Sequence, residues 1–540
     1  MALFDIRSLS FAYPGSSDKA LDDVSLTVER GELVALMGAT GSGKSTLLRL
    51  LKPELRQNGD IIGEVVFDGR ELSAVTSRES AMKIGYVAQS PDEQIVTDKV
   101  WHELAFTLEN LGAKREDIAR RIAEITAYFD IDDLYGRDTS TLSGGEKQLV
   151  NLAAVMTADP EVLLLDEPTA QLDPVAASRF IETIYRLNRE TGLTVIISEH
   201  RSEELLPLAD RLLIIERGRI VCDAPPRRVA EELPPDSQYL SYLPTAARLF
   251  RKTSGTGEPP LSIREGQRYL ERFKRNNELG PKSETAEKKP ALEMKNIWFR
   301  YERNGADILR DMELTVYEGE VFALLGSNGA GKSTAAMVAA GLRKPYSGSV
   351  RLFGKPLKAY ANGSLYQGNI SLLPQDAESV FLHETVRREL QGCEAAAASL
   401  PFDFTPLLDR HPYDISGGER QLVALCKALS TDPRLLIADE PSKGLDHNSK
   451  ELLRKVILGL KKRGVTVVVI SHDVEFAAMC ADRCALFSQG TVAACDETRR
   501  FLSDNRFYTT AASRITRRIF NGAVTEEQAL SLMEQNGGDR

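Results

Sequence analysis

Two glycine-rich loops dominate the chemistry of this sequence, and each ends in a lysine followed by two hydroxyl residues. Glycines let consecutive backbone N–H groups turn inward around phosphate oxygens, and a helix that starts there adds its positive dipole. We expect Lys44 and Lys332 to neutralise the terminal phosphates of a nucleotide, and Ser45 and Ser333 to bind Mg²⁺. Each loop follows an apolar strand and opens a helix, which favours this interpretation over a chance turn. The predicted phosphate-binding residues are Gly38, Gly41, Gly43, Lys44, Ser45 and Thr46 in the first loop, and Gly326, Gly329, Gly331, Lys332, Ser333 and Thr334 in the second.

Two acidic pairs, Asp166-Glu167 and Asp439-Glu440, each end an apolar strand. A buried strand that brings two carboxylates to the edge of a sheet is costly unless they meet a cation. We expect Asp166 and Asp439 to bind Mg²⁺ through its water shell. Glu167 and Glu440 are placed to polarise an attacking water. An acidic pair that merely caps a strand is improbable at this distance from a phosphate loop.

A histidine and a tyrosine recur at matched places in the two halves. His200 and His472 each end another apolar strand, where they are expected to hydrogen-bond the terminal phosphate and hold the water in place. Tyr13 and Tyr301 each precede the lysine of the phosphate loop by 31 residues. They either stack on adenine or are ordinary edge-strand tyrosines, and the sequence leaves both interpretations open.

A second kind of phosphate cradle appears once in each half, as Ser143-Gly-Gly145 and Ser416-Gly-Gly418. A serine and two glycines at the start of a helix present free N–H groups to an anion. One nucleotide hardly needs two such cradles from one domain. We therefore expect each cradle to complete the nucleotide site of the other half.

The motifs form an internal duplication whose register holds in blocks. The offset between the copies is 288 residues at Lys44 and Lys332 and falls to 273 at the acidic pairs. The offset is already 286 at Gln89 and Gln375, and the rest of the loss lies between Gln375 and Ser416, where the second copy has 41 residue steps and the first has 54. This pattern is typical of a duplicated domain in which insertions are confined to loops and one subdomain.

The apolar pattern predicts an α/β fold for each copy. Buried-type strands such as 33–37 and 162–165 alternate with helical stretches, which indicates a parallel sheet flanked by helices. Two short alternating strands, 3–6 and 9–13, precede that sheet, and residues 104–128 are predicted to form a helical insert. The predicted division is a first domain over 1–235, a linker with a short helix over 236–290, a second domain over 291–505 and a tail over 506–540. Within the linker, residues 262–273 are predicted to be helical and 281–290 to be solvated.

Composition fits a large globular protein that is not built around disulfides. The 540 residues need two large domains or more, and 42% of them are hydrophobic. A formal net charge of -10 argues mildly against nucleic-acid binding, although a local basic patch remains compatible with it. No apolar run reaches the length of a membrane span, and the N-terminus lacks the order of a signal peptide. Six cysteines indicate a reducing compartment, and Cys480 and Cys484 are better explained as two buried thiols on a helix than as a metal pair.

With these motifs in order, the sequence resembles the ATP-binding cassette superfamily over residues 1–235 and 291–505. The resemblance implies two P-loop ATPase domains, each with a mainly parallel sheet, an antiparallel N-terminal β subdomain and a helical subdomain. It also implies ATP and Mg²⁺ as cofactors, with Gln89 and Gln375 at the metal, and two sites shared between the halves. One site would join Lys44, Gln89, Asp166, Glu167 and His200 to Ser416 and Gly418, and the other would join Lys332, Gln375, Asp439, Glu440 and His472 to Ser143 and Gly145.

Within that superfamily, the stretch from Gln89 to Gln94 and the Ser-Glu-His-Arg run at His200 are similar to the duplicated ATPases of energy-coupling factor (ECF) importers. That resemblance implies a peripheral subunit on the cytoplasmic face of the cell membrane. Its partners would be a transmembrane scaffold and a small membrane protein that binds a vitamin or metal. The second copy lacks the second glutamine, which indicates that the two halves grip a scaffold differently. The alternatives are a soluble tandem cassette acting on ribosomes and a tandem sugar-importer ATPase, and the sequence does not specify the solute.

Overall fold

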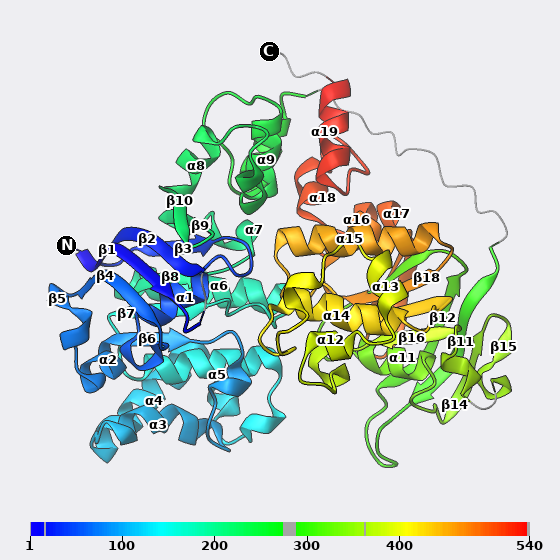
Figure 1. Ribbon diagram of the computed structural model, residues 1–540, viewed down its shortest axis with the longest axis horizontal. Helices are drawn as coiled ribbons and strands as arrows, with labels where there is room; N and C mark the ends of the chain where they lie inside the picture. Colours follow the sequence, from blue (N-terminus) through cyan, green and yellow to red (C-terminus); the bar gives the residue numbers. More distant parts are fainter. Residues whose placement is uncertain (1, 16–17, 274–287, 361–362, 537–540) are drawn as a thin grey trace. The chain divides into compact units, whose positions relative to one another are not determined.

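The computed structural model describes residues 2–15, 18–273, 288–360 and 363–536 and divides the chain into two compact units, Met1–Ser262 and Ile263–Arg540 (Figure 1). The division falls inside the segment predicted to be a linker. Residues up to 262 fold with the first unit, where helix α9 (Thr245–Lys252) buries Leu249 and Phe250. The predicted helix is α10 (Ile263–Leu270), and it belongs to the second unit. Most of the predicted solvated linker, 281–287, lies outside the described residues.

The large sheet of the first unit has the strand order β10-β9-β3-β8-β7-β6, parallel except for the antiparallel edge strand β10. Successive residues of its central strand enter different cores. Leu33 and Ala35 pack with the helical subdomain, whereas Val34 and Leu36 pack with the antiparallel sheet and α1. The strands are β3 (Leu33–Met37), β6 (Ile84–Val87), β7 (Val162–Asp166), β8 (Thr194–Ser198), β9 (Arg211–Glu216) and β10 (Arg219–Ala224). The main flanking helices are α1 (Lys44–Leu50), α2 (Ser77–Lys83), α6 (Pro174–Thr191), α7 (Ser202–Leu205) and α8 (Pro226–Glu232).

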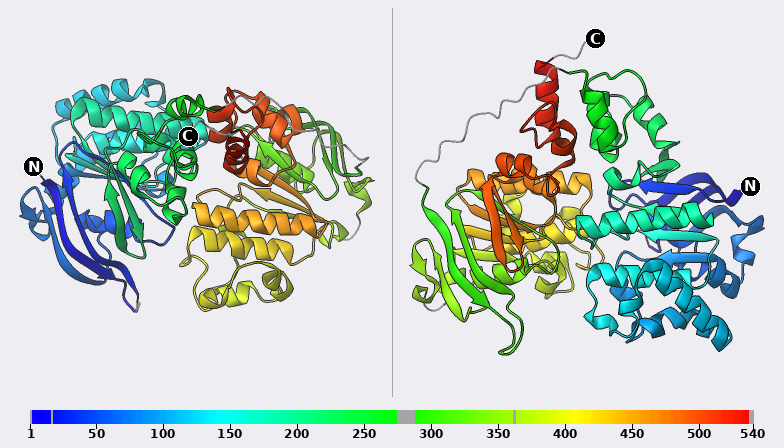
Figure 2. Two further views of the ribbon diagram at one scale, coloured as in Figure 1. Left: turned by 90° about the horizontal axis from the view of Figure 1, so that it is seen from above. Right: turned by 180° about the vertical axis from the view of Figure 1, so that it is seen from behind.

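The second unit repeats this sheet with the order β16-β17-β18-β13-β19-β20. Its strands are β13 (Val321–Leu325), β16 (Ile370–Leu373), β17 (Leu435–Asp439), β18 (Thr466–Ser471), β19 (Arg483–Ser488) and β20 (Thr491–Glu497). The flanking helices are α11 (Lys332–Ala339), α15 (His447–Lys462), α16 (Val474–Cys480) and α17 (Thr498–Asp504). The prediction of an α/β fold with a mainly parallel sheet in each half is therefore confirmed, and both sheets can be followed in Figure 2.

Each unit also carries a small antiparallel sheet, in the order β2-β1-β4-β5 and β12-β11-β14-β15. The prediction of two separate strands at 3–6 and 9–13 is wrong, because β1 (Ala2–Ala12) is one strand with a bulge at Ser8, whose φ is 47°. Gly63 crosses the bulge so closely that a Cβ there would lie 2.4 Å from the Ser8 carbonyl oxygen. Asn296 and Gly348 repeat the arrangement. The remaining strands are β2 (Lys19–Glu29), β4 (Asp60–Phe67), β5 (Arg70–Glu71), β11 (Pro290–Phe299), β12 (Leu309–Tyr317), β14 (Ser347–Leu352) and β15 (Lys355–Pro356).

The helical subdomains differ in size, as the shortened second copy predicts. In the first unit, the predicted insert 104–128 lies within two helices, α3 (Val100–Asn110) and α4 (Arg115–Phe129), which pack with α5 (Gly144–Met156). Gly112, with a φ of 70°, lies in the turn between them. The second unit has only the short α12 (Val386–Glu389) and α13 (Glu394–Ser399) beside α14 (Gly417–Leu429).

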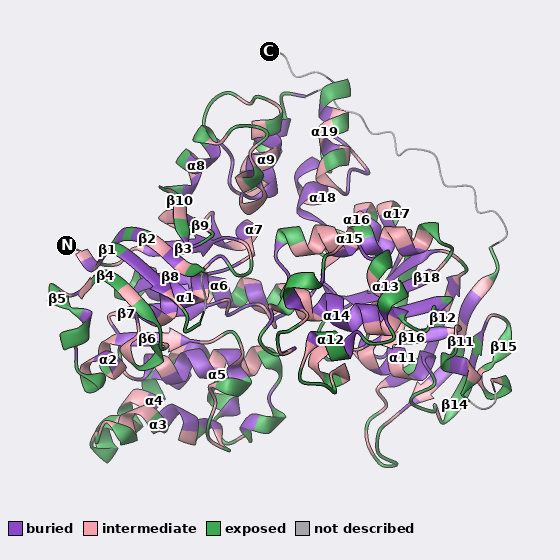
Figure 3. Cartoon of the chain, in the orientation of Figure 1, coloured by how far each residue is buried: buried purple, intermediate pink, exposed green. Residues whose placement is uncertain are grey.

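The tail of the chain is folded rather than extended, up to the last described residue. Helices α18 (Ala511–Thr516) and α19 (Glu526–Gln535) are in contact, and α10 packs against α18. The Gln267 side-chain amide donates to the Arg514 carbonyl oxygen at 2.7 Å, and the Phe273 ring contacts Phe520. The buried residues follow the two large sheets and the contact between α10 and α18 (Figure 3). Among the described residues, no helix is long and apolar enough to cross a membrane.

Candidate nucleotide sites

Both phosphate loops bury their lysine at the start of a helix. Lys44 begins α1, and its ammonium group donates to the carbonyl oxygens of Gly38 at 2.9 Å and Ala39 at 3.1 Å. Lys332 begins α11 and repeats the arrangement with the carbonyls of the equivalent loop residues. A Cβ at Gly38 would lie 2.3 Å from the Ile215 carbonyl oxygen, so only glycine fits there. The loop is thus shaped by the backbone, with the ammonium group held at its centre.

The remaining glycines and hydroxyls of the loops lie where the predicted cradle needs them. Gly41 and Gly329 have positive φ angles, as do the helix-capping residues Gly43 and Gly331. A Cβ at Gly326 would meet the Phe487 carbonyl oxygen at 2.4 Å. The hydroxyls of Thr46 and Thr334 are 2.9 and 3.1 Å from the hydroxyls of Tyr13 and Tyr301, respectively. Each tyrosine therefore lies beside the first turn of the loop helix, and the structure leaves adenine stacking untested.

The two strand-end aspartates have different surroundings. Asp166 accepts three hydroxyl hydrogen bonds, from Ser45 at 2.9 Å, Ser198 at 2.9 Å and Tyr86 at 3.2 Å. In the second unit, Oδ1 of Asp439 is buried and has no hydrogen-bond partner among the described residues. Burial raises the pKa of Asp439 to about 6, although a hydrogen bond from Ser333 acts in the opposite direction.

The strand register explains this difference. Asp166 pairs with Ser198 across β7 and β8, whereas Asp439 pairs with Ile470 across β17 and β18. In the neighbouring strand, Tyr86 of the first unit pairs with Leu164, and the corresponding pair in the second unit is Leu372 with Ile437. Two of the three hydroxyl donors are therefore hydrocarbons in the second unit. Comparison of the two copies could have revealed this from the sequence once the register was known.

The two glutamates share an unusual backbone conformation and a histidine partner. Glu167 and Glu440 have φ values of 44° and 50°, in the left-handed region where non-glycine residues are strained. His200 Nε2 lies 2.9 Å from Glu167 Oε1, and His472 Nδ1 lies 3.0 Å from Glu440 Oε2. Each glutamate is also 3.6 Å from the ammonium group of its phosphate loop. Burial opposes ionisation, yet the histidine and the lysine outweigh it and hold the pKa of both glutamates below the usual range.

The two glutamines predicted at the metal differ in their contacts. Gln89 follows β6 and donates from its amide to Glu167 Oε2 at 3.3 Å, while its side chain stays exposed. Gln375 follows β16 and is exposed. In the first unit the structure therefore brings together the lysine, aspartate, glutamate, glutamine and histidine that the sequence predicts. In the second unit it brings together all of these except Gln375, for which no contact to the others is seen in the described residues.

Gln94 explains how the glutamine-bearing segment of the first unit is held. Its amide accepts from the Ala88 N–H at 2.8 Å and from Asn151 at 3.0 Å, and it donates to the Tyr86 carbonyl oxygen at 2.8 Å. The equivalent positions of the second unit are Val380 and Ala424, so both partners of the Gln94–Asn151 bond are replaced together. The second glutamine of the motif is thus a structural clamp on the loop that carries Gln89.

A buried glutamate in each helical subdomain was not recognised from the sequence. Glu103 accepts the N–H groups of Val96 and Thr97 at 3.1 and 2.9 Å. Its counterpart Glu389 accepts from the backbone of Leu382 and His383 and pairs with Lys427. These bonds hold the far end of the glutamine-bearing segment in both units. The recurrence of a glutamate at the same offset after Gln89 and Gln375 was the available signal.

The serine-glycine cradles lie at the start of α5 and α14. Ser143 and Ser416 cap their own helices in capping boxes with Glu146 and Glu419. In the described part of the chain, neither serine bonds to the phosphate loop of its own unit. The N–H groups at the helix start, including those of Gly145 and Gly418, belong to the first turn, which has no intrahelical partners. This geometry fits an anion approaching from outside the unit.

Two further features lie apart from these residues. Cys480 ends α16 and Cys484 lies in β19, so the expectation that both are on one helix is wrong. Both thiols are free and buried, and burial raises the pKa of each.

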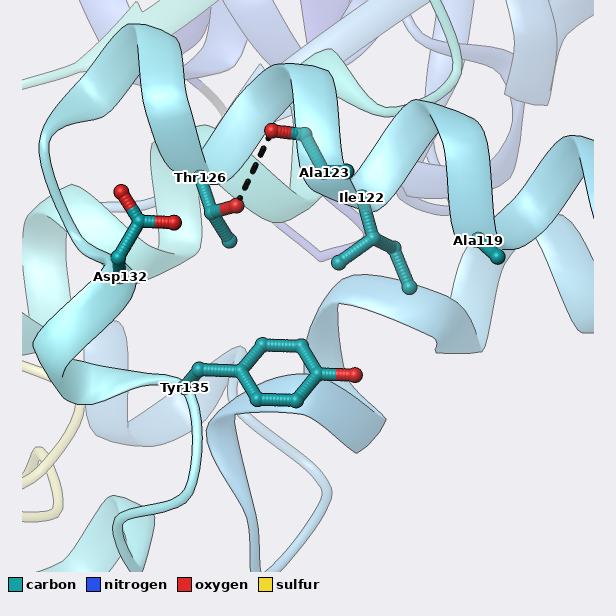
Figure 4. Close-up of a pocket in the computed structure, with 6 residues that line it drawn as sticks. All are labelled: Ala119, Ile122, Ala123, Thr126, Asp132 and Tyr135. Atoms are coloured by element: carbon teal, nitrogen blue, oxygen red, sulfur yellow. Dashed lines mark hydrogen bonds between the residues drawn. The ribbon is translucent and has the colours of Figure 1, made fainter.

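A hollow of about 320 Å³ on the helical subdomain of the first unit contains no predicted site residue (Figure 4). It is lined by Ala119, Ile122, Ala123, Thr126, Asp132 and Tyr135.

Comparison with known proteins agrees with this geometry. The family model described as ABC transporter matches residues 21–170 and 309–443. This chain is a member of the ABC transporter family. A Bacillus cereus protein, assigned by name to the ABC transporter ATP-binding proteins, is 41% identical over 97% of this chain and 96% of its own length. A Methanosarcina mazei protein with the same kind of name is 33% identical over 91% of this chain and 88% of its own.

Among solved structures, the archaeal ribosome recycling factor aABCE1, in complex with the ribosomal stalk protein aP1, has a TM-score of 0.58 and 22% identity. The match covers 92% of each chain. It shows the tandem fold. The chain is accordingly a tandem ABC ATPase that hydrolyses ATP with Mg²⁺ as cofactor, and the predictions of fold, enzyme class and cofactors are confirmed.

The residues present fit those cofactors. Oδ1 of Asp439 is buried without a donor, and Ser45 Oγ already bonds Asp166, so each unit offers a hydroxyl and a carboxylate suited to a hydrated Mg²⁺. ATP bound in the loop would supply the phosphoryl group, and Mg²⁺ would neutralise its charge. Lys44 and Lys332 would bind the phosphates, while Glu167 and Glu440 would hold the attacking water against the histidines. Among the described residues, no group of three or more His, Cys, Asp and Glu side chains is placed to hold a metal ion.

Proposed function

We propose that the chain is the ATP-hydrolysing, energising subunit of a membrane importer of the ECF type, which takes up a vitamin or a metal ion. ATP binding would close the two cassettes, membrane helices resting near Gln89 and Gln375 would move, and hydrolysis would reset the pair. The chain would then lie at the cytoplasmic face of the membrane. Its partners would be a transmembrane scaffold and a substrate-binding membrane protein.

The observation that supports this proposal is a set of three exposed apolar side chains in the segment that follows Gln89. Val96, Trp101 and Phe106 are 63%, 41% and 40% exposed. Val96 lies just beyond the clamped segment, and the other two lie on α3, the helix that follows it. Exposed aromatic and aliphatic groups that lie close together in the sequence favour a surface for a partner. Because Gln89 bonds Glu167, a movement of the segment that carries Gln89 would reach the catalytic glutamate through this side chain.

The second unit supports an unequal grip on the partner. Leu382, the counterpart of Val96, is 82% exposed, so an exposed apolar side chain is kept at this position. The counterparts of Trp101 and Phe106 are Arg387 and Gly392, and Arg387 pairs with Asp409. The aromatic part of the surface is therefore specific to the first cassette. A scaffold with two non-identical docking helices would match this difference.

We further propose that each serine-glycine cradle completes the nucleotide site of the other cassette, as the sequence predicts. The capped helix starts at Ser143 and Ser416 support this, because among the described residues neither serine bonds to the phosphate loop of its own unit. The test is a crossed set of substitutions in the full chain, in which the effect of Ser143→Arg is compared when one catalytic glutamate or the other is silenced.

The importer proposal is tested by purifying the tagged full chain from membranes in mild detergent and identifying the proteins that accompany it. We expect a polytopic scaffold and a small membrane protein in stoichiometric amounts. The variant Trp101→Arg, which copies the second cassette, is expected to lose the scaffold at least tenfold, whereas Arg387→Ala serves as the matched control. Recovery of the chain free of membrane proteins, or equal recovery with Trp101→Arg, would contradict the proposal.

A second candidate, a tandem factor that acts on ribosomes, is favoured by one observation. In this acidic chain, residues 263–273 and 498–520 contain nine arginines against three acidic residues. Phe507, between Arg506 and Tyr508, is 87% exposed. Cations around an exposed ring suit single-stranded RNA, which binds by phosphate contacts and stacking. Salt-sensitive sedimentation of the chain with ribosomes, lost in Phe507→Ala, would support this candidate over the importer.

A further inference from the structure

Glu199, next to the predicted catalytic histidine, is a buried carboxylate that the account above has not used. It is 3% exposed and follows the last residue of β8. Its Oε1 atom accepts the Thr169 N–H at 3.0 Å and the Thr169 hydroxyl at 2.5 Å. Its Oε2 atom accepts the His200 N–H at 3.0 Å. One carboxylate therefore joins two backbone segments.

Both segments carry groups of the nucleotide site. Thr169 lies two residues beyond Glu167 in the 167–173 loop, which ends where Asp173 caps α6. On the other side of His200, the Arg201 guanidinium donates to the Leu172 carbonyl oxygen of this loop at 2.9 Å. The histidine is thus tied to the 167–173 loop at the residue before it and at the residue after it.

Neither of these two ties is found among the described residues of the second cassette. Ser471 replaces Glu199, and its hydroxyl bonds Glu440 and the N–H of Asp473 instead. Ser442 replaces Thr169, and its buried hydroxyl has no partner among the described residues. Asp473 replaces Arg201 and pairs with Lys450 of α15. Among the described residues, ties from the residues that flank the histidine to the middle and end of the loop are therefore found only in the first cassette. In the second cassette Ser471 reaches only Glu440, at the start of the loop.

A bland explanation is that Glu199 merely satisfies buried N–H groups. A hydroxyl or amide would do that at lower cost, because burying a carboxylate is expensive unless several donors compensate it. Here three donors do so, and they belong to the 167–173 loop, at Thr169, and to the segment that carries His200. Charge-assisted hydrogen bonds of this kind hold their partners more firmly than neutral ones.

We propose that Glu199 is a positioning residue that couples His200 to the 167–173 loop, so that the histidine and the loop of the first cassette move as one unit. The proposal rests on ATP hydrolysis at the first site. It makes the two sites unequal: in the first, Glu199 links the histidine to Thr169 inside the loop, whereas in the second Ser471 reaches only Glu440 at the start of the loop. Loss of the link is expected to slow turnover at the first site without weakening nucleotide binding.

Hydrogen exchange in the nucleotide-free full chain tests the link without any activity. The variant Glu199→Gln keeps the shape of the side chain, but its amide has one acceptor oxygen in place of two and cannot accept from both segments. We therefore expect the backbone N–H groups of Thr169 and His200 to exchange about tenfold faster in this variant. Glu199→Ser, which copies the second cassette, is expected to do the same. Ser471→Ala is the matched control, and peptides that contain Ser442 and His472 should keep their rates in both Glu199 variants.

Kinetics then separate positioning from binding. With the second site silenced by Glu440→Gln, Glu199→Gln is expected to lower kcat about tenfold or more while KM stays within twofold, and Glu199→Asp is expected to recover part of the loss. Unchanged exchange at Thr169 and His200, or a raised KM with unchanged kcat, would overturn the proposal. If the unsubstituted chain did not hydrolyse ATP, the assigned activity would fail instead, while the exchange result would still report on the link.

Discussion

Removing the charge of Asp439 should stabilise the nucleotide-free chain, which is unusual for a predicted metal ligand. The pKa of this buried carboxyl rises from 3.8 to about 6 in the folded protein. Between those values the folded chain holds a proton that the unfolded chain has lost, so the free energy of unfolding falls as pH rises through that window. Above pH 6 the free energy of unfolding stays lowered by the full cost of ionising the buried Asp439 carboxyl. A shift of about two units corresponds to about 2–3 kcal/mol.

Asp439→Asn escapes this cost because the amide is neutral. In EDTA at pH 8 we expect the variant to be about 2–3 kcal/mol more stable, or roughly 5–10 °C higher in Tm. Near pH 5 the advantage should shrink to about half, because the wild-type carboxyl is then mostly protonated in the folded state but ionised in the unfolded chain. The chain has one tryptophan in each unit, Trp101 and Trp298, so urea unfolding in a Trp101→Phe background reports on the second unit alone.

The matched control is Asp166→Asn. Its amide oxygen can still accept the hydroxyls of Ser45 and Ser198, and Asp166 has two hydroxyl donors, Ser198 and Tyr86, that Asp439 lacks. With Trp298→Phe as background, we expect the stability to change by less than about 1 kcal/mol at either pH. An Asp439→Asn variant no more stable than wild type at pH 8, or a gain that does not decline toward pH 5, would refute the reasoning.

Three further predictions concern the segments that carry the glutamines. Glu103→Leu leaves the N–H groups of Val96 and Thr97 without their acceptor and should destabilise the first unit by about 2–4 kcal/mol, measured by urea unfolding; a loss below 0.5 kcal/mol would contradict this. Gln94→Val alone should raise proteolytic cleavage near Gln89, whereas adding Asn151→Ala should cost little more, because the pair is already broken; additive effects would show that the two act separately. Glu167→Gln together with Glu440→Gln should retain bound ATP and abolish turnover, and unchanged turnover would reject the catalytic assignment.

Much of the site could be predicted from the sequence because its parts are local. The phosphate loop, the strand-end carboxylates and the capping boxes each depend on a few adjacent residues. Lys44 and Asp166 could therefore be predicted as members of one site, and the structure places them in the same site. The differences between the halves could not be predicted in the same way. Tyr86 and Ser198 reach Asp166 from neighbouring strands, and their replacement by Leu372 and Ile470 has meaning only once the strand register is known.

The errors in prediction have physical causes as well. Residues 3–6 and 9–13 read as two strands because the bulge at Ser8 shifts the alternation of inward and outward side chains. The predicted boundary at residue 235 rested on the nucleotide motifs, none of which lies in η6 (Gln238–Tyr242) or α9, and both elements fall in the first compact unit. The role of Glu199 escaped notice because its partner Thr169 lies 30 residues away in the chain.

The central claim, that each cassette is completed by the serine loop of the other, is tested most directly by ATPase assays on paired substitutions. With Glu440 silenced as Gln, hydrolysis continues only at the site of Lys44 and Glu167. The account predicts that Ser416→Arg then abolishes the remaining activity, whereas Ser143→Arg leaves it within twofold. The opposite pattern, with Ser143→Arg abolishing the activity and Ser416→Arg leaving it intact, would show that each cassette uses its own serine loop and would contradict the account.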